Sequence, residues 1–165
     1  MMTPFVRKTC FSLVELVIVV VIIGVIAAIA VPRISSGAKG ASEAALRASL
    51  RALRNAIDLY AAEHAAAWPA QDKQLETFID QLTKRTNTAG EEGTTAGEHI
   101  YGPYLRAIPP VPVGPNVGAT GVRFKEDGNV WEGEQDIGWV YNFKTAHIYA
   151  NTNDLDESGV PYSSY

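Results

Sequence analysis

Hydrophobic residues are concentrated near the start of the chain. From Leu16 to Val31 the sequence reads LVIVVVIIGVIAAIAV and contains no charged or strongly polar residue. With Phe11 to Glu15 added, the segment has 21 residues, or about 31 Å of α-helix at about 1.5 Å per residue. This length matches a hydrocarbon core of roughly 30 Å. The pattern therefore predicts a membrane-spanning helix over residues 11–32.

Farther along the chain, the hydrophobic positions follow a helical stripe. Apolar side chains recur at spacings of four, three, four and three residues, at Leu46, Leu50, Leu53, Ile57 and Tyr60. This periodicity predicts an amphipathic helix whose apolar face packs on its own domain. The helix is expected to extend to about residue 66 and to end before Trp68, because the residue before a proline disfavours helical geometry.

The remaining elements are shorter. Leu75, Phe78, Ile79 and Leu82 predict a short helix over 72–84, with Asp72 as its cap. Residues 86–120 are rich in Gly, Thr and Pro and are expected to form a loop. Strand patterns at 121–125 and 129–132, and at 138–143 and 146–150, predict two hairpins within a small antiparallel sheet over 121–151, followed by a C-terminal tail. The expected fold class is α+β, with a long N-terminal helix packed on the sheet.

Charge and residue chemistry exclude several functions. The 18 acidic residues outnumber the 14 basic ones, which argues against direct binding to nucleic acid, because phosphates require Lys and Arg. Cys10 is the only cysteine, so no intrachain disulfide can form. His64, His99 and His147 are far apart in sequence and have no metal-ligand spacing. The sequence also has neither a GxSxG motif nor a P-loop. We therefore expect a protein that is not an enzyme and requires no cofactor.

The residues before the apolar segment bear on orientation. Arg7 and Lys8 precede it without an acidic neighbour, which predicts a cytoplasmic N-terminus and an exported C-terminal domain. Two alternatives remain at this point. The segment can be a signal peptide that is removed, or it can anchor a single-pass binding module that does not polymerise.

Glu15 is the single charge among these apolar residues. A carboxylate costs about 2.5–3.5 kcal/mol at mid-membrane and less near the interface. Glu15 can therefore lie shallow enough to reach water, or it can await a cationic partner within an assembly. Cleavage between Cys10 and Phe11 would create an α-amine four residues before Glu15. Pairing of that amine with Glu15 of the next subunit would fix the register of an assembly.

The stretch KTC-FSLVELVIVVVIIGVIAAIAVPRI resembles the N-terminal cleavage and methylation segment of type IV pilins and type II secretion pseudopilins. In those families prepilin peptidase cuts just before a Phe and methylates the new amine. The resemblance implies a leader over 1–10, processing at Cys10 and Phe11, and assembly roles for Glu15, Gly24 and Pro32. The family nearly always has Gly where this chain has Cys10.

The resemblance also implies a partner set and a location. It implies a homo-oligomeric helical filament, built by inner-membrane assembly machinery with minor pseudopilins, from subunits held in membrane lipid beforehand. The protein would be a single-pass protein of a bacterial inner membrane, with residues 33–165 forming a pilin-like head that is periplasmic or extracellular. A secretion pseudopilus and a surface pilus both remain open.

The head is more loosely similar to G-type pseudopilins, through GPYL, IPPVP and GWVYNFKTAHIYAN. Those proteins lack the disulfide of many pilus subunits and often order their C-terminal region with calcium. The resemblance therefore makes calcium possible here, with Asp154, Asp156 and Glu157 of NDLDESG as candidate ligands, since calcium takes oxygen ligands. Their spacing matches no calcium-loop motif, and a solvated acidic tail is the alternative.

Overall fold

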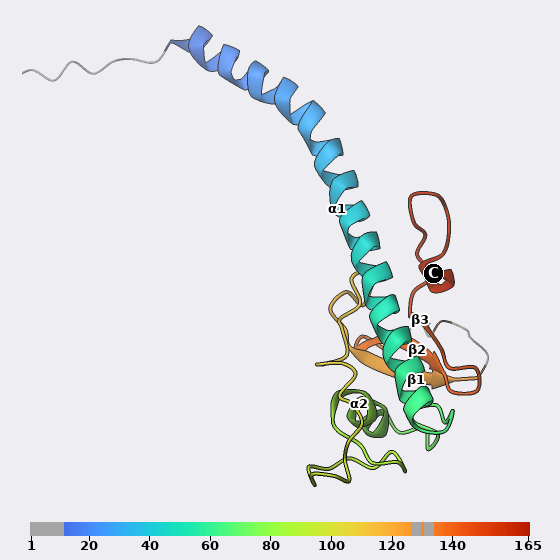
Figure 1. Cartoon of the computed structure of the whole chain (residues 1–165). Helices are drawn as coiled ribbons and strands as arrows, with labels where there is room; N and C mark the ends of the chain where they lie inside the picture. Colours follow the sequence, from blue (N-terminus) through green and yellow to red (C-terminus); the bar gives the residue numbers. More distant parts are fainter. Residues whose placement is uncertain (1–11, 127–129, 131–133) are drawn as a thin grey trace, which may run out of the picture. The chain divides into compact units, whose positions relative to one another are not determined.

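A computed structural model describes residues 12–126, 130 and 134–165, and at positions 30–36 it describes the backbone alone. The chain divides into two units, residues 1–40 and residues 41–165. Helix α1, Leu13–Glu63, contributes to both units (Figure 1). The second unit is the head, defined as residues 41–165.

In the first unit, the described side chains of α1 form an apolar cylinder. Thirteen of the seventeen residues from Leu13 to Ile29 are Leu, Val or Ile. Their side chains are between 45% and 79% exposed. Cys10 and Phe11 lie outside the described residues, and the side chain of Pro32 lies outside the described side chains.

The prediction of a membrane-spanning half over residues 11–32 is wrong on this structure. Over the part of the chain that is described, α1 has no stretch that combines the length and the apolar character needed to cross a bilayer.

In the head, the predicted amphipathic stripe of α1 is confirmed. The five stripe residues Leu46, Leu50, Leu53, Ile57 and Tyr60 are all at most 2% exposed and belong to one hydrophobic core. The helix ends at Glu63, slightly earlier than expected. Ala65 and Ala66 follow with φ of 53° and 63°, and this left-handed geometry ends the helix before Pro69 can do so.

Helix α2, Leu75–Thr83, lies within the predicted 72–84. Its apolar side chains Phe78 and Leu82 are buried in the core. The N-cap is Gln74, so the prediction of Asp72 as the cap was wrong. Asp72 instead organises the approach to the helix, because its carboxylate accepts hydrogen bonds from the Gln74 backbone N–H at 3.1 Å and the Thr77 hydroxyl at 2.7 Å.

The sheet contains β1 (Gly121–Lys125), β2 (Ile137–Asn142) and β3 (His147–Ala150), in the order β1-β2-β3. The predicted antiparallel sheet is corrected to a mixed one, because β1 pairs with β2 in parallel. The connection over 126–136 is long enough, at about a dozen residues, for a parallel crossover. The strand expected at 129–132 lies, except for Val130, outside the described residues.

The second predicted hairpin is confirmed, since β2 and β3 pair antiparallel. Its turn is stabilised by the Asn142 Oδ1, which accepts hydrogen bonds from the backbone N–H groups of Lys144 and Thr145 at 3.0 and 3.1 Å. The residues of β2 do not alternate between buried and exposed, since Gly138 to Asn142 are all buried. As the central strand, β2 is covered more completely than a half-exposed strand.

Candidate functional site

The strongest functional signal is the surface of α1 from Leu13 to Ile29, which we call the apolar helix surface. Its large side chains are exposed on every side of the helix, with no polar face. A helix that is hydrophobic all round is normally buried, and contiguous apolar exposure of this kind marks an interaction site. We therefore expect this surface to be buried in contacts with other molecules.

Two predicted assembly residues lie within this surface. Glu15 occupies the first turn of α1, where a negative charge is favoured by the positive end of the helix dipole. Its carboxylate forms no hydrogen bond or ion pair with any residue that the structure describes. A Cβ added at Gly24 would meet no atom within 4 Å. Nine residues separate Glu15 from Gly24, which is about half a turn from the same face, so the two lie on opposite sides of the helix.

Of the three candidate calcium ligands in the C-terminal segment, Asp156 has a carboxylate that is engaged within the segment itself. The Asp156 Oδ1 accepts hydrogen bonds from the backbone N–H groups of Ser158 and Val160 at 2.7 and 2.8 Å, and its Oδ2 accepts one from the Tyr165 hydroxyl at 2.6 Å. The hydrogen bond from Tyr165 is the main reason that the pKa of Asp156 is lowered. Among the described residues, no group of three or more His, Cys, Asp or Glu side chains is placed to hold a metal ion.

The three histidines are placed in different environments. His64 is 4% exposed and stacks on Tyr60 with ring centroids 4.0 Å apart. Its Nδ1 lies 2.8 Å from the Tyr60 carbonyl oxygen, and its Nε2 lies 3.0 Å from the Thr86 hydroxyl. The buried His99 ring packs against the backbone of Gly93, and His147 is exposed on β3.

His64 therefore anchors the start of the segment 86–120, which was predicted from the sequence only as a loop. It was missed as an anchor, although it lies four residues after Tyr60 and so continues the buried stripe of α1. Burial raises the pKa of the neighbouring Tyr60 to about 12, because a charged phenolate would lose its hydration in the core. These side chains form a packed polar anchor rather than a reactive cluster.

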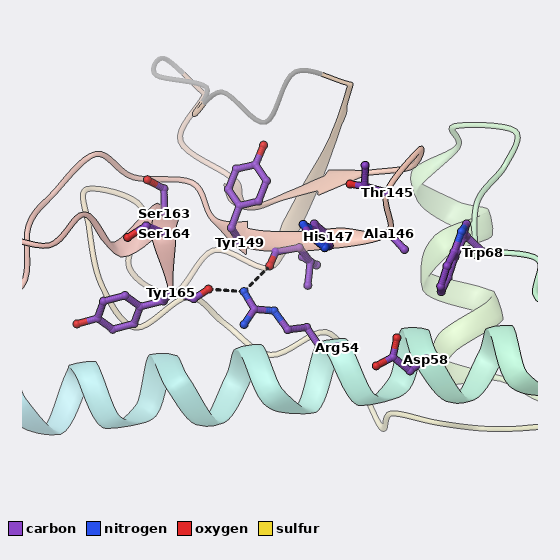
Figure 2. Close-up of a pocket in the computed structure, with 11 residues that line it drawn as sticks. Arg54, Asp58, Trp68, Thr145, Ala146, His147, Tyr149, Ser163, Ser164 and Tyr165 are labelled. Carbon is purple, nitrogen blue, oxygen red and sulfur yellow. Dashed lines mark hydrogen bonds between the residues drawn. The ribbon is translucent and has the colours of Figure 1, made fainter.

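A groove of about 620 Å³ runs between α1, the β2–β3 turn, β3 and the C-terminal segment (Figure 2). Arg54 reaches into it from α1, and its guanidinium donates a hydrogen bond to the Ile148 carbonyl at 3.1 Å and another to the Tyr165 carbonyl. Asp58, Trp68 and His147 also line the groove. The Arg54 guanidinium is thus already hydrogen-bonded to two backbone oxygens of the groove.

Contacts between α1 and the C-terminal segment were not predicted from the sequence. Tyr162 is buried and donates a hydrogen bond from its hydroxyl to the Glu43 Oε1 at 3.1 Å. Arg47 donates to the Tyr165 hydroxyl at 3.0 Å and lies over the Tyr165 ring. The sequence signal for these contacts was weak. Glu43, Arg47 and Arg54 lie along one side of the helix, and such a pattern of charged residues usually indicates a solvent-exposed face.

Comparison of the chain with protein families, curated proteins and solved structures finds no match.

Proposed function

We propose that this chain is the structural subunit of a helical filament, of the type IV pilin or type II secretion pseudopilin kind, assembled through the apolar helix surface. The observation that carries this proposal is the exposure of the thirteen Leu, Val and Ile side chains between Leu13 and Ile29. The occupant of this surface is the same segment of neighbouring subunits, and the heads coat the outside.

The size of the hydrophobic effect favours several neighbours over one. Full burial of a Leu, Val or Ile side chain contributes about 1.5–3 kcal/mol. A single neighbouring helix that covers about five of them therefore contributes roughly 10 kcal/mol. Association itself costs an estimated 4–15 kcal/mol, so one neighbour gives marginal binding. Coverage on all sides, as in the core of a filament, makes the assembly stable.

The placement of Glu15 and Gly24 on opposite sides of α1 supports a head-to-tail arrangement. A helix contacting its neighbour through Gly24 presents Glu15 to a different neighbour. Contacts between two different surfaces are heterologous, and they produce an open helical assembly when the rotation does not close. Gly24 also permits close approach of a neighbouring backbone, because it has no side chain.

Glu15 is the residue that sets register in this proposal. Burial of a carboxylate without a partner is costly, so only the stagger that supplies a cation is stable. The cation is the α-amine that prepilin peptidase releases by cutting between Cys10 and Phe11 in a neighbouring subunit. Assembly machinery and minor pseudopilins are the further partners that the resemblance implies. The lack of a disulfide in the head favours a secretion pseudopilus over a surface pilus.

The test of polymerisation is disulfide cross-linking of the full chain in a Cys10→Gly background, which removes the native thiol and places at the cleavage site the residue that the family nearly always has there. Two cysteines are introduced, Leu16→Cys and Ile26→Cys, and the assembled protein is oxidised and separated by denaturing electrophoresis. A heterologous contact between these positions gives a ladder of covalent multimers. The matched control, Leu16→Cys with Thr95→Cys on an exposed head loop, is expected to stop at dimers. Monomers alone across a set of such pairs in α1 would refute the filament.

The register role is tested separately by Glu15→Gln, which keeps the shape and removes the charge. We expect filaments seen by electron microscopy to become fewer or to lose regular order, whereas Glu76→Gln on the head leaves them unchanged. Normal filaments from Glu15→Gln would remove the register role and leave the apolar interface intact.

Processing is tested by mass spectrometry of the N-terminus, where a methylated Phe11 start is expected.

A further inference from the structure

A small pocket of about 280 Å³ lies between the end of α1, the segment that follows it, α2 and the loop after α2. We call it the Tyr60 pocket, because Tyr60 of α1 lines it. Trp68 forms another part of its lining and also borders the groove that contains Arg54 (Figure 2). Ligand pockets range upward from roughly 300 Å³, so the Tyr60 pocket has room for one small molecule or one side chain.

The Tyr60 hydroxyl is a buried polar group at this pocket. Tyr60 is 2% exposed, and its hydroxyl forms no hydrogen bond with any residue that the structure describes. The hydroxyl lies against Gly90, because a Cβ added to Gly90 would collide with the hydroxyl oxygen. The neighbouring Ala89 belongs to the pocket lining. Buried hydroxyls are normally hydrogen-bonded, so this one indicates a partner that enters the pocket.

The lining of the pocket is held in place by hydrogen bonds within the head. The Gln81 side chain accepts a hydrogen bond from the Ala70 backbone N–H at 2.8 Å and donates one to the Gly90 carbonyl at 3.2 Å. Ala70 and Lys73, on either side of Asp72, have φ of 56° and 61°. Residues other than glycine rarely adopt such angles, and those that do cluster at binding sites. The pocket is therefore formed before a ligand arrives.

Asp72 supplies a carboxylate with unused acceptor positions. It lines the pocket, and its two oxygens accept one hydrogen bond each, from the Gln74 backbone N–H and from the Thr77 hydroxyl. An ionised carboxylate has about four acceptor positions. Asp72 can therefore accept further hydrogen bonds from a ligand without giving up those that orient it.

The charge around the pocket favours a cation. An adjoining hollow of about 500 Å³ shares Thr77, Gln81 and Ala89 with the pocket and adds four carboxylates, those of Glu76, Asp80, Glu91 and Glu92. Lys84 offsets two of them, since its ammonium pairs with Asp80 and Glu92. Lys73 instead lies over the Phe143 ring, 4.4 Å from its centroid. Among the described residues that line the two hollows, none is Lys or Arg, so the local potential is negative and attracts cations.

The shape of the cation follows from the other groups. Trp68 is only partly buried against the core, and an indole face attracts an ammonium group. A primary ammonium has three donors and no acceptor, which matches the acceptor positions of Asp72 and Tyr60. We propose that the Tyr60 pocket binds a primary ammonium group on an unbranched alkyl chain, with the ammonium bonded to the Asp72 carboxylate and the Tyr60 hydroxyl oxygen and the chain against Trp68.

A lysine side chain of another protein and a free alkylamine share this chemistry. The inference does not depend on the proposed filament, since the apolar helix surface takes no part in it.

The first test is a titration of the full chain, in detergent micelles, with n-butylamine, which has the length and charge of a lysine side chain. Saturation-transfer NMR of the amine measures binding. We expect saturable binding, and binding of n-butanol that is weaker by at least about tenfold because butanol has no charge. Glucose tests the alternative of a sugar site and should not bind. Lack of saturable binding, equal binding of n-butanol or tighter binding of glucose would overturn the proposal.

Variants then assign the bound amine to this pocket. Tyr60→Phe removes the hydroxyl and keeps the ring, so binding should weaken about fivefold, and Asp72→Asn should weaken it by at least about tenfold. The matched control is Glu98→Gln, because Glu98 is exposed and lines neither hollow. Unchanged binding by Tyr60→Phe and Asp72→Asn, or an equal loss with Glu98→Gln, would place the amine elsewhere and refute the site.

Gln71→Lys keeps the test decisive if Asp72→Asn lowers the unfolding midpoint of the head. Gln71 is exposed, lines the pocket and forms no hydrogen bond with the described residues, so its replacement removes no such contact. The introduced ammonium should occupy the pocket and block n-butylamine, and undiminished binding would refute the site.

The source of the ammonium is decided by Nα-acetyl-lysine methylamide, which carries the lysine side chain on a peptide backbone. Binding as tight as that of n-butylamine supports a lysine of a partner protein. Binding that is weaker by about tenfold or more supports a free alkylamine, because the backbone is then excluded from the pocket entrance.

Discussion

At the scale of single residues, Tyr60 and His64 show how one turn of α1 combines packing with polar anchoring. Tyr60 lies in the hydrophobic core, and its ring also contacts Tyr104 edge-on with centroids 5.9 Å apart. His64 stacks on Tyr60 from the next turn and reaches Thr86 at the start of the following loop. The two aromatic side chains thus join the end of the helix to a segment more than twenty residues away.

Ionisation of Tyr60 should destabilise the head at alkaline pH. Its pKa is raised to about 12 from 10.0 by burial, so the folded head retains this proton where the unfolded chain releases it. The contribution to stability is fully present below pH 10 and is lost as the pH rises from 10 to about 12, by roughly 2–3 kcal/mol. Urea unfolding of Tyr60→Phe should show a shallower decline over this window, by about one proton. An unchanged slope would contradict a buried neutral Tyr60.

Truncation of Leu50 and of Leu59, both on α1, should affect stability to very different extents. Leu50 is 1% exposed in the core, and Leu59 is 53% exposed. Leu50→Ala leaves a cavity and should lower the free energy of unfolding by about 2–5 kcal/mol. Leu59→Ala should change it by less than about 0.5 kcal/mol. Chemical denaturation measures both, and similar losses would show that the burial of this face is misassigned.

At the scale of elements, the sequence predicted those features that depend on neighbouring residues. The buried stripe from Leu46 to Tyr60 and the β2–β3 hairpin were predictable, because helical periodicity and turn residues are local signals. The parallel pairing of β1 with β2 was not, since it joins segments across a long connection. The packing of residues 155–165 against α1 was also unpredictable, because one buried tyrosine, Tyr162, leaves no hydrophobic pattern.

The candidate site, too, could be predicted from the sequence only in part. The apolar helix surface was predictable from its run of Leu, Val and Ile residues. Glu15 was predictable because it is the one charged residue within that run. The prediction that this segment spans a membrane was not supported by the described helix. The roles of Arg54 and Glu43 depend on which backbone groups fold back against α1, and residue type alone carries no such information.

The loop after α2 should be sensitive at Gly90. Gly90 has a φ of +79°, and an added Cβ would lie 2.3 Å from the Tyr60 hydroxyl oxygen. Gly90→Ala should therefore lower the free energy of unfolding by about 2–4 kcal/mol, through both backbone strain and displacement of Tyr60. Gly97→Ala is the control, since Gly97 has a φ of +88° but open space around it. Its loss should be only about 1–2 kcal/mol, and equal losses would mean that the contact with Tyr60 is unimportant.

At the scale of the whole molecule, one chain carries two surfaces with different requirements. The head buries its stripe of α1 internally, whereas the apolar helix surface has no internal partner among the described residues. Assembly and folding should therefore be separable by mutation. A change that abolishes assembly need not alter the stability of the head.

Ile22→Asp tests this separation, because Ile22 is 53% exposed in the middle of the apolar helix surface. A buried carboxylate there would be costly in an assembly, so we expect sedimentation to show at least a tenfold loss of polymer. The unfolding midpoint of the head should remain within experimental error. Thr95→Asp on the head loop is the control and should preserve polymer. Normal polymer from Ile22→Asp would exclude this surface as the interface.

The contacts of the C-terminal segment, residues 155–165, with α1 bear on the order in which the head is expected to fold. Its contacts join residues that are 118 positions apart, between Arg47 and Tyr165, and 119 apart, between Glu43 and Tyr162. Contacts of such separation form late, because the entropy of closing a long loop must be overcome first. During synthesis, α1 can fold long before its last partners have left the ribosome. The C-terminal segment is therefore expected to be the last part of the head to dock on α1.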